Sequence, residues 1–155
     1  MTDGLMSFRS RMEKLNDVVY ISLFVAIKLL VAYLFSLVAL EFLGRSVMSD
    51  TPGWGSRTQA FITIVLLGPF VETYFCQYLF FKYLSRYFSG GVIILLSAIV
   101  FGLLHTYNSV YVVYAFFSGL LLSLSYYYRL NSFPYVFAFL IHSIYNLLTF
   151  LLNNR

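Results

Sequence analysis

The stretch FITIVLLGPFVETYFCQYLFF, residues 61–81, decides how this chain folds. As a helix it is about 30 Å long, since each residue adds about 1.5 Å, and that length matches the hydrocarbon core of a bilayer. The only side chain in it that ionises near neutral pH is the carboxylate of Glu72. A carboxylate at membrane depth costs about 2.5 kcal/mol or more, so Glu72 marks a functional site and needs polar partners.

The rest of the chain is equally apolar. Of its 155 residues, 61% are hydrophobic and 10% are charged, whereas soluble domains carry about 25% charged residues. This composition predicts an all-α, polytopic bundle of transmembrane helices, with the lipid bilayer as its first partner. The net charge of +4 is spread over the loop ends and forms no basic run, so we expect no nucleic-acid partner.

Apolar segments of membrane-spanning length recur along the chain and are separated by polar or turn-rich loops. We predict about five spans, at residues 18–43, 61–81, 91–105, 110–128 and 133–152. Residues 1–17 are polar and mixed in sign, which predicts a short juxtamembrane segment ahead of one transmembrane domain, 18–155. The apolar run after this polar lead exceeds the roughly 15 residues of a signal-peptide core, so we expect the first span to remain as an anchor.

The distribution of basic residues predicts the orientation of the bundle. Five spans place the two chain ends on opposite sides, and cytoplasmic loops carry an excess of Lys and Arg. A cytoplasmic N-terminus puts most of the basic loop residues inside, and we therefore expect an integral protein of the cell membrane in this orientation. The inside set is Arg9, Arg11, Lys14, Lys82, Arg86 and Arg129, against Arg45, Arg57 and Arg155 outside.

Few other polar residues lie inside the predicted spans. His105 and His142 are the only two histidines of the chain. Asn146 follows His142 by four residues, so both lie on one helix face, and Phe101 precedes His105 by four residues and is expected to shield its imidazole. Counted along the spans, these side chains and Glu72 fall within a slab of about 10 Å near the middle of the bilayer. Three helices can therefore bring them to one polar site.

Three short motifs contain these residues: ETYFCQ at 72–77, FGLLH at 101–105 and HSIYN at 142–146. In this order they resemble the Glu-Glu-x-x-x-Arg, Phe-x-x-x-His and His-x-x-x-Asn motifs of the CPBP family of intramembrane proteases. That family includes the type II CAAX prenyl endopeptidases and the bacterial Abi and bacteriocin-processing proteins. The resemblance covers residues 69–146, about half of the chain.

The resemblance implies a role for each matching residue. Glu72 corresponds to the base that activates a water molecule, and His105 to the histidine that assists it. His142 and Asn146 correspond to the pair that binds the oxyanion or a metal. The implied activity is intramembrane endopeptidase activity on a peptide or protein substrate in or near the bilayer.

Two positions depart from the family pattern. Thr73 stands where the second glutamate is expected, and Gln77 where the arginine is expected. Because they are four residues apart, we expect them to touch on the helix as a neutral polar pair. Both charges are lost together, so we interpret Thr73, Gln77 and Phe101 as supporting residues whose changes do not abolish activity.

The same departure leaves the cofactor open. A zinc hydrolase with two His and one Glu as ligands needs a further carboxylate as base, and Glu72 is the only acid in the middle of a span. Either His105 and His142, with Asn146 as a further candidate ligand, hold a divalent metal such as Zn²⁺ with Glu72 as base, or no metal takes part. We favour the metal-free version, in which Glu72 and His105 orient the water and His142 and Asn146 stabilise the oxyanion.

Other interpretations of these residues remain. Lys28 lies inside the first span, where it extends to the interface or pairs with another helix. Glu72 could be a purely structural carboxylate that pairs with Lys28 or with a histidine. The bundle could also be a catalytically inactive binding or immunity protein built on the same motifs. A third alternative is a haem b carrier with His105 and His142 as axial ligands.

Overall fold

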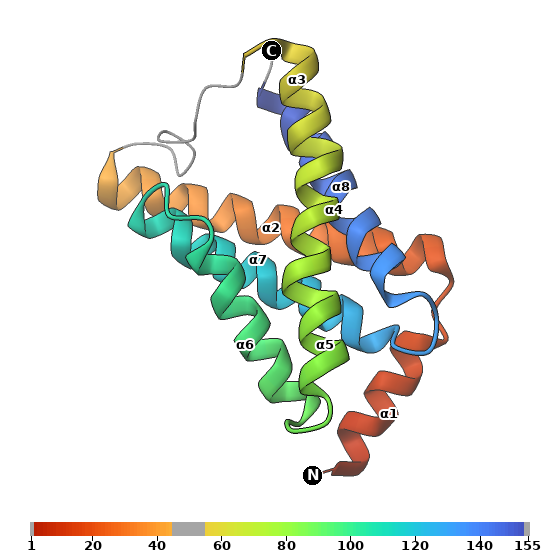
Figure 1. Cartoon of the computed structure of the whole chain (residues 1–155). Helices are drawn as coiled ribbons and strands as arrows, with labels where there is room; N and C mark the ends of the chain where they lie inside the picture. Colours follow the sequence, from red (N-terminus) through yellow and green to blue (C-terminus); the bar gives the residue numbers. More distant parts are fainter. Residues whose placement is uncertain (1, 45–54, 154–155) are drawn as a thin grey trace.

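The chain is a bundle of helices with no strand in the part that the structure describes, residues 2–44 and 55–153 of a computed structural model (Figure 1). Within that part, four helices are long and apolar enough to cross a membrane. The prediction of an all-α bundle of membrane-spanning helices is therefore confirmed. Arg45 and Arg155, two of the predicted outside residues, lie outside the described residues.

The helix bounds follow the predicted spans closely for four of the five segments. The second span is one continuous rod in which short α-helical and π-helical pieces alternate. Its pieces are α3 (Arg57–Phe61), η1 (Ile62–Leu67), α4 (Gly68–Glu72), η2 (Thr73–Tyr78) and α5 (Leu79–Leu84). The other helices are α1 (Thr2–Glu13), α2 (Asp17–Leu43), α6 (Gly90–Leu103), α7 (Ser109–Tyr128) and α8 (Pro134–Asn153).

The third predicted span, 91–105, differs from its prediction at its end. Helix α6 has 14 residues, a length of about 21 Å, which is shorter than the bilayer core of about 30 Å. His105 therefore lies beyond the helix, in the turn between α6 and α7. Asn108 begins α7 there by accepting a hydrogen bond from the Tyr111 backbone at 2.8 Å. Non-helical backbone at membrane depth is tolerated where it is buried in protein or lines a polar cavity.

Arg129, at the end of α7, holds the N-terminal segment against the bundle. Its side chain is 4% exposed and forms an ion pair with Asp17 at 3.1 Å. It also donates to the backbone carbonyls of Glu13 and Leu15, at 3.2 and 2.7 Å, and lies 4.3 Å from the centre of the Tyr20 ring. The α1–α2 junction and the end of α7 are thus at the same end of the bundle.

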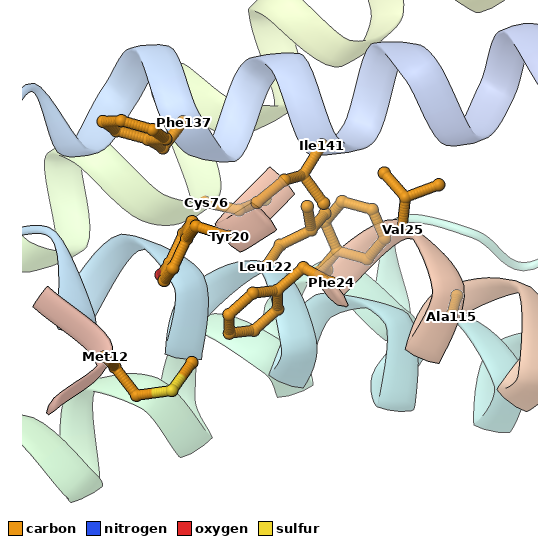
Figure 2. Packing of buried hydrophobic residues seen from close by; sticks show 10 residues of the cluster. Met12, Tyr20, Phe24, Val25, Cys76, Ala115, Leu122, Phe137 and Ile141 are labelled. Carbon is orange, nitrogen blue, oxygen red and sulfur yellow. The ribbon is translucent and has the colours of Figure 1, made fainter. Parts of the chain in front are cut away.

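The hydrophobic core lies where α2 crosses α7 and α8. Figure 2 shows these buried side chains meeting from separate helices. The Tyr20 hydroxyl, inside this core, donates to the Ser125 carbonyl at 2.7 Å, so its polar atom is satisfied. Many large apolar side chains on the outside of the bundle are exposed, as expected for a surface that faces lipid. The core cluster is Met12, Tyr20, Phe24, Val25, Cys76, Phe101, Ala115, Leu122, Phe137 and Ile141.

Candidate active site

The Gly68-Pro69 pair shapes the helix next to Glu72. Pro69 has no backbone N–H, so it cannot donate to the carbonyl of Val65 four residues earlier. The Gly68 N–H bonds to the Thr63 carbonyl five residues earlier, which is π-helical pairing and leaves the Ile64 carbonyl free for another donor. The disturbance before the carboxylate thus takes the form of a π-helical segment, Ile62–Leu67.

Helix α8 binds the carbonyls that this disturbance exposes. The Ser143 hydroxyl donates to the Val65 carbonyl at 2.6 Å, and the Asn146 side-chain amide donates to the Ile64 carbonyl at 2.8 Å. These two bonds set the depth and rotation of α8 against the second span. His142, one residue before Ser143, is thereby turned toward the face of the second span that carries Glu72.

Glu72 lies between the two histidines. Its Oε2 atom is 3.8 Å from His105 Nε2 and 3.7 Å from His142 Nε2, and its side chain is 29% exposed. These distances are too long for direct hydrogen bonds. One water molecule lying above the three atoms can bond to all of them. The predicted meeting of the three side chains is therefore present, while their catalytic roles stay a prediction.

The end of α6 orients the imidazole of His105. The His105 backbone N–H donates to the Gly102 carbonyl at 3.0 Å, so it does not occupy the Phe101 carbonyl. That carbonyl instead pairs with His105 Nδ1 at 2.7 Å. Because a carbonyl only accepts, we assign the proton to Nδ1, which leaves the Nε2 lone pair facing Glu72. Two acceptors that face each other need a donor between them, and a water molecule fits that need.

Phe101 and His142 complete the inner wall of the site. The Phe101 ring stacks on the His105 ring at a centroid distance of 4.5 Å and lies 5.7 Å from the His142 ring. It is 2% exposed, so it keeps both imidazoles against an apolar surface, whereas the sequence predicted this contact for His105 alone. His142 Nδ1 is buried and has no hydrogen-bond partner among the described residues.

A cavity of about 200 Å³ opens onto these groups. It is large enough for several water molecules, each of which takes about 30 Å³ in the liquid. Four tyrosines contribute to its wall, and neither they nor Ser118 were predicted from the sequence. The only available signal was that Tyr145 lies between His142 and Asn146 in the third motif. The full lining is Thr63, Ile64, Gly68, Glu72, Phe101, His105, Tyr107, Tyr111, Tyr114, Ala115, Ser118, His142, Tyr145, Asn146 and Thr149.

Thr73 and Gln77 do not form the expected pair. Both side chains are fully buried, and the Thr73 hydroxyl and the Gln77 carbonyl oxygen each lack a hydrogen-bond partner in the described part of the chain. The Gln77 amide instead lies 3.5 Å from the Ser123 hydroxyl. Ser123 contacts the hydroxyl of Ser97 at 2.6 Å, and Ser97 donates to the Cys76 carbonyl, also at 2.6 Å. Gln77 therefore joins the second span to α6 and α7 and does not bond to its own helix neighbour.

The donor set does not match a three-ligand zinc site. No group of three His, Cys, Asp or Glu side chains with the arrangement of a metal centre occurs in residues 2–44 and 55–153. A metal-bound imidazole also donates its second nitrogen to a carboxylate, carbonyl or water, and His142 Nδ1 has no such protein partner. The side-chain amide of Asn146 already donates a hydrogen bond to the Ile64 carbonyl. We therefore derive no step through a metal.

The comparisons with known proteins place this site within a family. A sequence model described as "Type II CAAX prenyl endopeptidase Rce1-like" matches residues 54–148. No curated protein and no solved structure matches the chain. The matched region is more than half of the chain, contains Glu72, His105 and His142, and agrees with the resemblance noted in the sequence. The chain therefore belongs to the Rce1-like family of type II CAAX prenyl endopeptidases.

Proposed function

We propose that the chain is an intramembrane endopeptidase that hydrolyses a peptide bond with a water molecule held by Glu72 and His105, with His142 beside it as a donor to the oxyanion. The observation that supports this most directly is the approach of both Nε2 atoms to one carboxylate oxygen, at 3.8 and 3.7 Å, beside a cavity. Family membership supports protease activity in general. The geometry adds which atoms could hold the attacking water.

The reaction begins with the two hydrogen atoms of that water. One is accepted by Glu72 Oε2 and the other by the Nε2 lone pair of His105, so an oxygen lone pair is directed at the peptide carbonyl. As the C–O bond forms, the proton passes to Glu72. His142 and the second amide hydrogen of Asn146 donate to the carbonyl oxygen as it becomes an oxyanion. Glu72 then returns the proton to the leaving nitrogen and the C–N bond breaks, which gives an amine and a carboxylic acid. The acid then passes its remaining proton to the amine, so the products leave as a carboxylate and an ammonium.

The size of the cavity limits what it can hold. Pockets that enclose drug-sized ligands measure about 300–1,000 Å³, and this one measures about 200 Å³. We propose that it takes the scissile peptide and the attacking water. A long apolar tail, such as the prenyl group in the family's name, would then lie in the lipid along the exposed apolar faces of the helices.

We propose that the protein lies in the cell membrane with its N-terminus in the cytoplasm. Two of the six predicted inside residues support a common basic end. Arg9 lies 4.8 Å from the centre of the Tyr127 ring at the end of α7, where Arg129 binds Asp17. The positive-inside rule then places this end in the cytoplasm.

Purified protein in liposomes tests the proposal. We expect cleavage of quenched fluorescent peptides, prenylated or not, that persists after prolonged treatment with a zinc chelator and is lost in Glu72→Ala. Loss of cleavage on chelation and recovery with added Zn²⁺ would contradict the metal-free reaction. Binding of the peptides without any cleavage by the wild-type protein would instead favour the catalytically inactive alternative.

The close packing of α6 on α7 yields a further prediction, at Gly119. A Cβ atom there would lie 2.7 Å from Phe101 Cβ, so Gly119→Ala must displace the ring that stacks on His105. We expect a fall in Tm of about 5 °C and a loss of kcat/KM between about tenfold and a hundredfold. Differential scanning fluorimetry and the peptide assay measure both effects.

Gly91→Ala is the matched control, because a Cβ atom at Gly91 meets open space on the same helix as Phe101. It is expected to keep the activity and the Tm of the wild type. Wild-type turnover in Gly119→Ala would show that the position of Phe101 does not matter for the reaction.

A further inference from the structure

Lys28 is a buried lysine that none of the three motifs contains. It belongs to α2, outside the family match at 54–148. Its side chain is 1% exposed, so the amine does not extend to a membrane interface. The ammonium donates to Ser118 Oγ at 2.6 Å and lies 4.7 Å from the centre of the Tyr145 ring. Removing an ion from water costs several kcal/mol, so a lysine at this depth calls for an opposite charge.

Both contacts of Lys28 lead to the wall of the active-site cavity. Ser118 and Tyr145 line the cavity together with Glu72. Ser118 and Tyr114 lie four residues apart on α7, and therefore on one face of that helix. The hydroxyls of Tyr114 and Tyr145 are hydrogen-bonded to each other. These hydroxyl groups form a polar layer between the ammonium and the cavity. Oriented groups of this kind transmit an electrostatic effect strongly where the dielectric is low.

The charges in the bundle interior balance only when Lys28 is counted. In the middle of the described spans, Glu72 is the one carboxylate and Lys28 the one ammonium. The positive charge of Lys28 is near enough to interact electrostatically with the Glu72 carboxylate and with the imidazole of His142. The ammonium of Lys28 bonds to Ser118 and not to Glu72 directly. Its charge therefore acts on the Glu72 carboxylate across the cavity wall.

We propose that Lys28 is a positioning residue of the active site and the counter-charge of Glu72, acting through Ser118 and the Tyr114–Tyr145 pair. Its effect on hydrolysis rests on the proposed function, whereas its effect on stability rests on the geometry alone. A fixed positive charge behind the hydroxyl layer stabilises the carboxylate before the reaction. The same charge stabilises the oxyanion that forms in the cavity during the reaction.

A double-mutant cycle between Lys28→Met and Glu72→Gln tests this assignment. Each single change leaves the other charge buried without compensation, and we expect the Tm in detergent to fall by about 10 °C in each. In the double variant both charges are absent, and we expect a Tm within about 3 °C of the wild type. Lys82→Met is the matched control, because Lys82 is exposed and also bonds to a hydroxyl, that of Tyr78 at 3.0 Å. Its effect should be the same with and without the Glu72 charge.

The kinetic arm separates positioning from packing. We expect Lys28→Met to lower kcat by roughly tenfold to a hundredfold with little change in KM, and Lys28→Arg to restore most of the loss. Equal losses of Tm for Lys28→Met in both backgrounds, or a double variant that fails to fold, would overturn the proposal. The cycle requires no proteolysis, so full coupling in an inactive protein would contradict the proposed function and retain Lys28 as the counter-charge.

Discussion

Glu72→Gln is expected to lower kcat/KM for peptide cleavage by about a thousandfold or more. The amide has nearly the shape of the carboxylate, so the 3.7–3.8 Å separations from the two imidazoles can persist. An amide oxygen does not take up the proton of the attacking water and has none to return to the leaving nitrogen. Since no second carboxylate lies in the middle of the described spans, no neighbour can replace it.

Glu41→Gln is the matched control for this change. Glu41 is exposed near the end of α2 and lines no part of the cavity, so its substitution should leave turnover unchanged. Steady-state kinetics give the activity, and circular dichroism together with gel filtration establish that each variant is folded. A fall in Tm of about 10 °C is expected for Glu72→Gln, because Lys28 loses its counter-charge. A Glu72→Gln variant with one tenth of wild-type turnover would exclude Glu72 as the base.

The apolar runs predicted the long helices because a bilayer leaves few alternatives. Backbone groups in hydrocarbon must bond within their own segment, so length and hydropathy are enough to place a spanning helix. The run 91–105 was predicted too long because hydropathy does not report where a helix stops. Side-chain bonds at the α6–α7 turn set the end of α6. Asn108 caps the start of α7, and His105 Nδ1 bonds to the Phe101 carbonyl at the end of α6.

The convergence of Glu72, His105 and His142 could be predicted from the sequence. The depth of each residue follows from its spacing along the span, and polar residues in lipid pair with one another because leaving them unpaired is costly. The partners of Gln77 could not. Spacing of four residues implies contact on an ideal α-helix, whereas Thr73–Tyr78 is π-helical and its buried amide faces Ser123 on α7. That bond depends on how the second span packs against α7, and residue spacing along one helix carries no information about this packing.

The place of Lys28 illustrates the same limit. Sequence alone identified it as a lysine inside a span and left open whether it reached the interface or paired with another helix. Its 1% exposure and its bond to Ser118 decide for the inter-helix pairing. The link from Lys28 through Ser118 to the cavity arises only when α2 and α7 pack together, so neither segment gives a signal of it by itself.

His105 is the residue at which orientation and chemistry can be separated by substitution. Asparagine can place a donor where Nδ1 bonds the Phe101 carbonyl, whereas glutamine can place an acceptor near the position of Nε2, which faces Glu72. We expect both variants to lose between about a hundredfold and a thousandfold in kcat. If the Nε2 lone pair accepts a hydrogen from the attacking water, His105→Gln retains about ten times more activity than His105→Asn.

His105→Ala sets the baseline for this comparison, because it removes both nitrogens. We expect the Asn variant to keep a higher Tm than the Ala variant, since the bond to the Phe101 carbonyl closes the end of α6, and yet to be no more active. The opposite order, with Asn more active than Gln, would mean that His105 serves to hold the helix end and that Glu72 orients the water without it. The two orders differ because a helix end requires only a donor on the Phe101 side, whereas hydrolysis requires an acceptor on the side of the cavity.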